Sequence, residues 1–182
     1  SITKGIIRLT GSSDNPPGLT EDEIKGVIDQ GLKDKAIEKQ ESELVHGALN
    51  FDDIVIRSVM TPRTKMFTLN SKKILFEALP EINNSGFSRI PVYSENSDNI
   101  IGIVHVRDVL KSLEHNEKVI SLESIMREPI FVSQEKMVSD LLKEMRGRQT
   151  HMAIVVDEFG GVEGCVTLED LLEEIVGEIH DE

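Results

Sequence analysis

The sequence repeats a unit of about sixty residues, and this repeat constrains the fold more than any other feature. Three segments of the first unit return in the same order in the second, at spacings of 66, 63 and 62 residues. The matching segments are 59–62 with 125–129, 88–93 with 151–156, and 102–110 with 164–172. Because a repeated supersecondary unit buries its apolar face against a neighbouring copy, we expect two similar halves that pack together.

Apolar spacing predicts the same elements in each half: a strand, a helix, two strands joined by a polar turn, and a final helix. Pro80 lies within the first of these helices, where it should either bend or break it. This order predicts an α+β fold in which helices cover two small sheets, related by a pseudo-twofold axis. The predicted ranges are 66–69, 74–82, 90–93, 100–104 and 106–113 in the first half, and 130–132, 138–145, 153–156, 162–166 and 168–176 in the second.

The residues before the repeats predict a linker and two helices. Residues 1–19 contain a Gly-, Ser- and Pro-rich stretch with strong turn chemistry. Thr20 and Glu23 form the pattern of a capping box, so a helix should begin there and end near Gly31, a residue type favoured at helix C-caps. A second helix is expected from about residue 34 to residue 50.

Composition excludes several classes of protein. The chain has 182 residues, 20 Lys and Arg against 33 Asp and Glu, and a formal net charge of −13. Such a charge excludes a protein that neutralises a nucleic-acid backbone, and it would repel a free nucleotide unless Arg residues or a divalent cation offset the field.

A single cysteine, Cys165, fits a reducing compartment. No apolar run approaches the ~20 residues of a membrane span. Because the chain starts at Ser1 without a signal peptide, we expect a piece of a longer protein.

Thr167 and Asp170 form the sharpest local pattern, and it has two interpretations. A hydroxyl and a carboxylate three residues apart at a helix start are typical of a capping box. The same groups can instead face a nucleotide, with free helix N–H groups and the hydroxyl near phosphate and the carboxylate on ribose hydroxyls. The repeat favours the second interpretation, because Asp108 occupies the equivalent position in the first half.

The motifs at 60–63, 85–93, 102–110 and 157–179 resemble a known family. They read Met-Thr-Pro-Arg, Ser-Gly-Phe-Ser-Arg-Ile-Pro-Val-Tyr, Gly-Ile-Val-His-Val-Arg-Asp-Val-Leu, and a long acidic segment that begins Asp-Glu-Phe-Gly-Gly. They are similar to the paired CBS domains (named after cystathionine beta-synthase) of CorC-like and hemolysin C-like proteins, relatives of the cyclin M magnesium transport mediators. The resemblance covers residues 50–182.

The resemblance implies that an adenine nucleotide, ATP or AMP, binds in a cleft between the halves, with magnesium screening its phosphates. It places Thr167 and Asp170 at the ribose and phosphates, Thr61 and Pro62 beside adenine, and Phe87 on the base. The full set that it implies is Thr61, Pro62, Phe87, Ser88, Arg89, Ile90, Pro91, Thr167 and Asp170. Arg57, Arg63, Lys65 and Arg89 put positive charge near these motifs, and the alternative for all four is an ordinary mixed surface. That alternative explains Arg57 and Lys65 equally well, whereas the site is favoured for Arg89.

A second, symmetry-related cleft is expected to be weaker. His105 stands where Thr167 stands in the other half, and an imidazole cannot copy the hydroxyl cap, although it can donate one hydrogen bond. The residues assigned to this weaker site are His105, Asp108, Met126, Arg127 and Met152.

The resemblance also implies the setting of the module. It predicts a linker and helical segment at 1–53 that follows a membrane domain, CBS domain 1 at 54–116, and CBS domain 2 at 117–182. The module would lie in the cytoplasm beneath the inner or plasma membrane, form homodimers, and control transport or efflux of magnesium or cobalt. The alternative is a dimerisation module that needs no nucleotide.

No enzyme and no metal site are expected from the residues. The sequence contains no Walker loop, no nucleophile elbow and no constellation for acid/base catalysis, and its histidines and cysteine lack zinc-ligand spacing. Ten acidic residues and no Lys or Arg occupy 157–182. They could attract magnesium, but such a run is more typical of a solvated acidic face.

Overall fold

The computed structural model describes residues 19–114 and 120–177. The chain divides into two compact units, residues 1–46 and residues 47–182. The two units are described separately. The predicted linker at 1–19 lies outside the described residues except for Leu19, as do residues 178–182 of the acidic stretch. Within the described ranges, no helix combines the length and the apolar character that a bilayer crossing requires.

The first unit contains helix α1 (Glu21–Lys33) and most of helix α2 (Lys39–Asn50). The predicted capping box is present, because the Thr20 backbone N–H donates to the Glu23 carboxylate at 2.7 Å and the Glu23 N–H donates to the Thr20 hydroxyl oxygen. The predicted end at Gly31 is wrong. The helix continues to Lys33, and the chain reverses at Lys35, whose φ of 55° is left-handed, before α2 begins.

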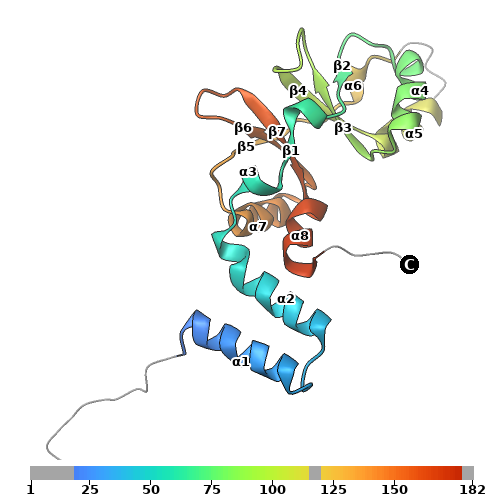
Figure 1. The fold of residues 1–182 in the computed structure, drawn as a ribbon. Coiled ribbons are helices and arrows are strands. Elements are labelled where there is room, and N and C mark those ends of the chain that lie inside the picture. Colours follow the sequence, from blue (N-terminus) through green and yellow to red (C-terminus); the bar gives the residue numbers. More distant parts are fainter. Residues whose placement is uncertain (1–18, 115–119, 178–182) are drawn as a thin grey trace, which may run out of the picture. The chain divides into compact units, whose positions relative to one another are not determined.

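The second unit contains both repeats, and each has the predicted strand–helix–strand–strand–helix order (Figure 1). The first half consists of β2 (Leu69–Asn70), α4 (Leu75–Ser85), β3 (Arg89–Tyr93), β4 (Ile100–His105) and α5 (Val106–Glu114). The second half consists of β5 (Ile130–Ser133), α7 (Val138–Arg148), β6 (Met152–Val156), β7 (Val162–Thr167) and α8 (Leu168–Val176). In both halves the first strand pairs in parallel and the hairpin is antiparallel.

The segments that open each half cross to the other half. After a short 3-10 turn and α3 comes β1 (Thr61–Pro62), which pairs antiparallel with β7 and makes the order β1-β7-β6-β5, and a second 3-10 turn follows β1. In the same way Arg127 bridges to Ile103 of β4, beside the sheet β2-β3-β4. The helices of these segments, α3 and α6, pack into the core of the opposite half. Their bounds are η1 (Phe51–Asp53), α3 (Ile56–Val59), η2 (Arg63–Lys65) and α6 (Leu122–Ile125).

Three apolar clusters hold the second unit together. One lies under α7 and α8, a second lies under α4 and α5, and the third joins the two sheets. The predicted packing of the two half-sheets against each other is confirmed by this third cluster, whose buried members are Ile100, Ile103, Met152, Ile154, Val162 and Cys165. The clefts described next lie at the edges of this sheet-to-sheet contact.

Helix α4 continues through Pro80. The alternative that Pro80 breaks the helix is therefore wrong, and the ring sits on the exposed side of α4. The helix ends at Gly86, whose φ of 72° is a left-handed conformation that favours glycine. This tight ending turns the chain so that Phe87 and Ser88 lead directly into β3.

Candidate functional site

A cavity of about 290 Å³ lies between the two halves, and we refer to it as the first cleft. Its volume is near the lower end of the range of ~300–1,000 Å³ found for small-molecule sites. One wall comes from the chain after β1 and from the start of β3, and the other comes from β6, β7 and the first turn of α8. The lining residues are Thr61, Lys65, Met66, Phe67, Phe87, Ser88, Arg89, Pro91, Met152, Cys165, Thr167, Glu169 and Asp170.

Most of the residues assigned to the stronger site line this cleft. They are Thr61, Phe87, Ser88, Arg89, Pro91, Thr167 and Asp170. Ile90 does not line it, because side chains alternate along β3 and Ile90 points into the core, where it is fully buried. Pro62 is exposed and is paired with Gly164 at the edge of the sheet, and it does not line the cleft either.

Thr167 and Asp170 form a capping box at the start of α8. The Asp170 carboxylate oxygen Oδ2 accepts from the Thr167 N–H at 2.7 Å, and the Asp170 N–H donates to the Thr167 hydroxyl oxygen at 3.2 Å. The interpretation of this pair as a capping box is therefore correct. The interpretation as a nucleotide site stays open, because both side chains are only partly buried and both line the first cleft. In addition, the cap uses only one of the two carboxylate oxygens of Asp170.

The cleft contains positive charge beside its acidic residues. Arg89 lies with its Nη1 3.9 Å from Glu169, and its Nε is buried without a hydrogen-bond partner among the described residues. A buried donor without an acceptor destabilises a protein by about 1–3 kcal/mol. Lys65 adds a second cation to the lining. This arrangement favours an anionic ligand that supplies the missing acceptor.

An aromatic pair forms part of the cleft wall. Phe67 and Phe87 stack with ring centroids 6.1 Å apart and an interplanar angle of 28°. Phe87 is 53% exposed, so much of its ring is available to a planar ligand. The sequence pattern does not mark Phe67 and Met66 as lining residues, because it predicts an ordinary strand over 66–69, whereas the strand begins only at Leu69. Lys65, for which the sequence leaves a site and an ordinary surface equally open, does line the cleft.

Cys165 lies on the floor of the cleft as a buried, unmodified cysteine. Burial, followed by the nearby charge of Asp170, raises the pKa of its thiol to about 11. At neutral pH the thiol therefore stays protonated, and Cys165 packs as a small buried hydrophobe rather than serving as a nucleophile.

A second cavity, of about 230 Å³, adjoins β4 and the start of β6, and we refer to it as the second cleft. Of the residues assigned to the weaker site, His105, Arg127 and Met152 line it. Asp108 does not, because both Nε and Nη2 of Arg127 donate to its carboxylate, at 2.8 and 2.7 Å. Met126 does not line it either, because its side chain packs over Gly102.

Two of the basic residues near the motifs pair elsewhere. Arg57 donates to Glu135 at 2.8 Å, and Arg63 pairs with Asp98. Neither residue lines the first or the second cleft. Within the described part of the chain, no cluster of three or more His, Cys, Asp or Glu side chains is arranged to hold a metal ion.

Comparison with known proteins assigns this architecture. The CBS domain family matches residues 56–115 and 122–177. A solved CBS domain of the bacterial CNNM/CorC family Mg²⁺ transporter is 39% identical, with a TM-score of 0.79 over 90% of this chain and 99% of that one. The chain belongs to the tandem CBS domains of the CNNM/CorC family.

Two further comparisons bear on this CBS module. A structure of the CNNM/CorC family CBS domain in complex with ATP is 42% identical, with a TM-score of 0.72 over 77% of this chain and 99% of that one. The magnesium and cobalt efflux protein CorC of Escherichia coli K12 is 40% identical over 161 residues, which are 88% of this chain and 55% of CorC. The module thus spans about half the length of that relative. The prediction that the module is not an enzyme is confirmed by these relationships.

Proposed function

We propose that this CBS module binds an adenine nucleotide, ATP together with magnesium, in the first cleft and thereby regulates a divalent-cation transporter. The observation that carries the proposal is the meeting, in one cavity between the halves, of the Phe67–Phe87 pair, the cations Arg89 and Lys65, and the Thr167–Asp170 pair. A related CBS domain of the same family has been solved with ATP.

The residues of the first cleft fit the parts of a nucleotide. The exposed ring of Phe87 and the apolar side chains of Met66 and Met152 suit a planar base. The Thr167 hydroxyl and the second carboxylate oxygen of Asp170 suit ribose hydroxyls. Arg89 and Lys65 suit phosphates, and a phosphate would give the buried Arg89 Nε the acceptor that it lacks.

Magnesium enters the proposal through charge. Glu169 and Asp170 line the same cleft, and the whole chain carries a net charge of −13. A triphosphate would be repelled by this field, whereas its magnesium complex carries less charge. We therefore propose that magnesium arrives on the nucleotide rather than on protein ligands, and that AMP is the alternative ligand with the least charge.

The setting of the module follows as part of the same proposal. We propose that residues 1–53 connect a membrane domain to CBS domain 1 at 54–116 and CBS domain 2 at 117–182, on the cytosolic side of the inner or plasma membrane. The transported cation would be magnesium or cobalt, the ions in the name of the E. coli relative. Nucleotide binding would change transport only through its different affinities for two conformations of the module.

The test is calorimetry with ATP, with and without magnesium, on three proteins. The parent chain is expected to bind, and Thr167→Ile is expected to bind at least about tenfold more weakly, since it loses a polar contact and places a larger apolar side chain in the cleft. Thr167→Ser keeps the hydroxyl and should bind like the parent. Thr20→Ala removes a capping box that does not line the cleft, and it controls for the loss of a cap.

The proposal fails if the parent shows no heat with millimolar ATP, or if Thr167→Ile and Asp170→Ala bind as tightly as the parent. Far-UV circular dichroism on each variant establishes that it is folded. Repeating the titration with AMP and ADP shows which nucleotide the cleft prefers.

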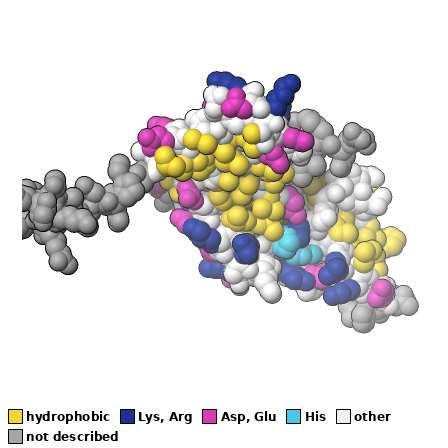
Figure 2. Space-filling view, turned by 90° about the horizontal axis from the view of Figure 1, so that it is seen from below, with side chains coloured by type: hydrophobic (Ala, Val, Ile, Leu, Met, Phe, Trp, Pro, Cys, Tyr) yellow, Lys and Arg dark blue, Asp and Glu magenta, His cyan; other side chains and the backbone are white. Residues whose placement is uncertain are grey.

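A nucleotide-independent dimerisation module is the second candidate, because apolar side chains remain exposed on the last helix of each half. Leu110 and Leu113 of α5 are 58% and 40% exposed, and Leu172 and Val176 of α8 are 42% and 41% exposed. Hydrophobic side chains also gather at the surface on the face drawn in Figure 2. Sedimentation of the parent and of Leu110→Ser, with and without ATP, separates the candidates. A dimer that ATP leaves unchanged, in a protein without ATP binding, would favour dimerisation alone.

A further inference from the structure

The second cleft is unusually rich in cations for so acidic a chain. Three arginines line it from three different segments: Arg89 from the start of β3, Arg127 from the segment that crosses between the halves, and Arg148 from the end of α7. His105 and His151 lie among them, and Glu128 is the acidic residue of the lining. Guanidinium groups that converge from separate elements are typical of sites that bind oxyanions.

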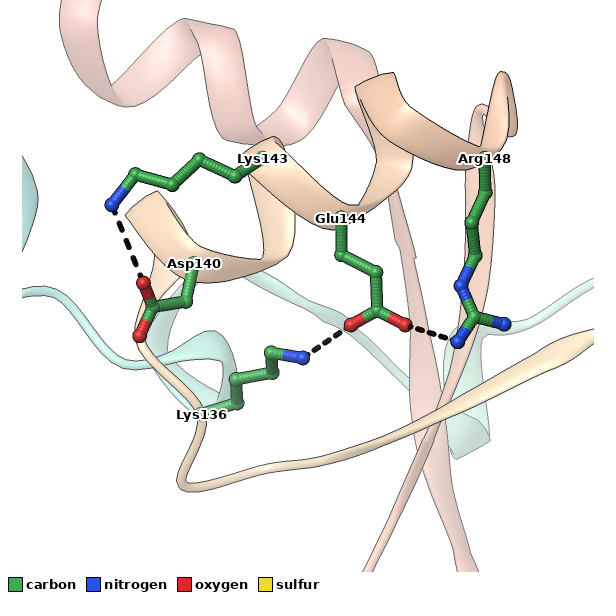
Figure 3. Close-up of polar contacts among 5 residues, drawn as sticks. All are labelled: Lys136, Asp140, Lys143, Glu144 and Arg148. Carbon is green, nitrogen blue, oxygen red and sulfur yellow. Dashed lines mark hydrogen bonds and ion pairs between the residues drawn. The ribbon is translucent and has the colours of Figure 1, made fainter.

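Carboxylates outside the lining hold two of these arginines in place. Arg127 uses Nε and Nη2 on Asp108, and Arg148 uses Nη2 on Glu144 at 3.0 Å. Glu144 is itself held by Lys136, which lies on the loop before α7 (Figure 3). Because a guanidinium has five N–H donors, these contacts orient the two groups and leave further donors for a ligand.

The third arginine lies between the two clefts. Arg89 and Met152 line both cavities. The Nε of Arg89 is buried and has no acceptor among the described residues. An oxyanion in the second cleft is one of the two ligands that could supply this acceptor, the other being a phosphate in the first cleft.

The second cleft lacks the groups that would suit a nucleoside. Its lining contains no Phe or Tyr ring. His105 replaces the threonine of the other half, and Asp108, which would correspond to Asp170, is already occupied by Arg127. What remains is a small cavity with cationic donors, a few apolar side chains and no Phe or Tyr ring on which a base could stack.

The charges around His105 agree with an anion site. The pKa of His105 is lowered, and burial is the largest cause. The positive charges of Arg127 and Arg89 lower this pKa further, and His151 lowers it by a smaller amount. The Asp108 carboxylate acts in the opposite direction and raises it. Arg148 and Glu128 are the remaining charged groups of the lining. An anion placed among these groups would relieve the repulsion, and binding would therefore be accompanied by uptake of a proton.

We propose that the second cleft binds a free phosphate-type oxyanion, with inorganic phosphate as the simplest ligand, through Arg127, Arg148 and Arg89. This site is separate from the nucleotide site proposed above and does not depend on it. The alternative source of the same chemistry is the phosphate end of a nucleotide, and the experiment distinguishes the two.

The experiment is a titration of the folded chain with inorganic phosphate, followed by calorimetry and by NMR signals of the His105 and His151 imidazoles. We expect saturable binding in the millimolar range, and binding about tenfold weaker in Arg148→Gln and Arg127→Gln, the size expected for one charge-assisted hydrogen bond. Arg146→Gln removes an exposed charge from the same helix end without touching the lining, and it should bind like the parent.

Three results would overturn the proposal. The first is the absence of binding at millimolar phosphate, and the second is binding that Arg148→Gln and Arg127→Gln leave unchanged. The third is ATP binding that weakens in Arg148→Gln while phosphate alone does not bind, because the cleft would then hold only the phosphates of a nucleotide. Thr167→Ile should leave phosphate binding intact, so a failure of the nucleotide proposal would be recognised separately.

A sulfate titration at two pH values adds a second readout, the pH dependence of the affinity for the anion. If the arginines only stabilised the fold, this pH dependence would not involve His105. The charge of sulfate is constant between about pH 6 and about pH 8, on either side of the usual histidine pKa. Affinity for sulfate should rise toward the lower pH in the parent and rise less in His105→Asn. An affinity that falls toward the lower pH would contradict the placement of His105 in the site.

Discussion

Gly164→Ala tests whether the crossing of β1 onto β7 shapes the first cleft. Gly164 pairs with Pro62, and a Cβ at Gly164 would lie 2.3 Å from the Thr61 carbonyl oxygen and 3.2 Å from the Met60 sulfur. The contact is with backbone, so no side-chain rotation relieves it. The φ of Gly164 is not positive, and the expected effect is therefore steric rather than conformational.

The magnitude follows from two contributions. Overpacking at a close contact destabilises by typically 1–3 kcal/mol, and weakening the pairing of β1 removes about 1 kcal/mol more. We expect Gly164→Ala to lower the free energy of unfolding by roughly 2–4 kcal/mol, which corresponds to a fall in Tm of roughly 5–15 °C for a chain of this size. Because Thr61 lines the first cleft, affinity for ATP should fall as well.

Urea denaturation and thermal scans measure the change against two matched glycine variants. A Cβ at Gly147 of α7 would meet nothing within 4 Å, and Gly147→Ala should stabilise the protein by up to about 1 kcal/mol. A Cβ at Gly102 would meet the Met126 side chain at 2.3 Å. Rotation can move the Met126 sulfur away but not the Met126 Cβ, which would lie 2.8 Å from the new Cβ, so Gly102→Ala should also destabilise, though less than Gly164→Ala. Equal stability of Gly164→Ala and the parent would refute the reasoning.

Three further changes test individual contacts. Pro80→Ala should raise the free energy of unfolding by roughly 1–3 kcal/mol in urea denaturation, because it restores a backbone donor within α4. The hydrogen bond from Lys136 lowers the pKa of Glu144, so its stabilisation is present above the usual glutamate pKa and is lost as the pH falls through the lowered value. Glu144→Gln should therefore unfold more easily than the parent at neutral pH, and the difference should shrink as the pH falls below the usual glutamate pKa. Burial raises the pKa of Cys165 to about 11, so alkylation at about pH 8 should be far slower in the folded protein than in urea.

The repeat predicted the secondary structure of the second unit closely because hydrophobic periodicity and turn residues are local signals. The strand–helix–strand–strand–helix order and the packing of the sheets were both predicted correctly. The ends of elements were less predictable. Gly31 resembles a C-cap, but the helix continues to Lys33, since glycine does not force the left-handed conformation and Lys35 adopts it instead.

The crossing of the opening segments could not be predicted from side-chain patterns, because it depends on backbone pairing between residues far apart in the sequence, 104 positions in one half and 24 in the other. Thr61 pairs with Cys165, and Arg127 bridges to Ile103. The signal that was present is the pair of glycines, Gly102 and Gly164, at equivalent positions in the two halves. Each glycine leaves space for the segment that crosses onto its strand.

The candidate site was predicted in part for a related reason. Residues in motifs, such as Arg89 and Thr167, were found, whereas Met66 and Phe67 reach the cleft only because the chain after β1 turns across it. The ion pair between Arg127 and Asp108 was also missed, since partners 19 residues apart share no helical spacing. These contacts depend on tertiary structure, which a local pattern does not specify.

The two proposed ligands should oppose each other, because both are anions and both lie against Arg89. One guanidinium cannot give the same donors to a nucleotide phosphate in the first cleft and to a free phosphate in the second. We expect saturating phosphate to weaken ATP binding by roughly 5- to 20-fold, and ATP to weaken phosphate binding by the same factor, since the coupling between two sites is reciprocal. Calorimetry of each ligand in the presence of the other measures both factors. In Arg89→Gln both affinities should fall and the coupling should shrink. ATP affinity that does not change with phosphate, in a protein that binds both ligands, would show that the two clefts act independently and that Arg89 serves only one of them.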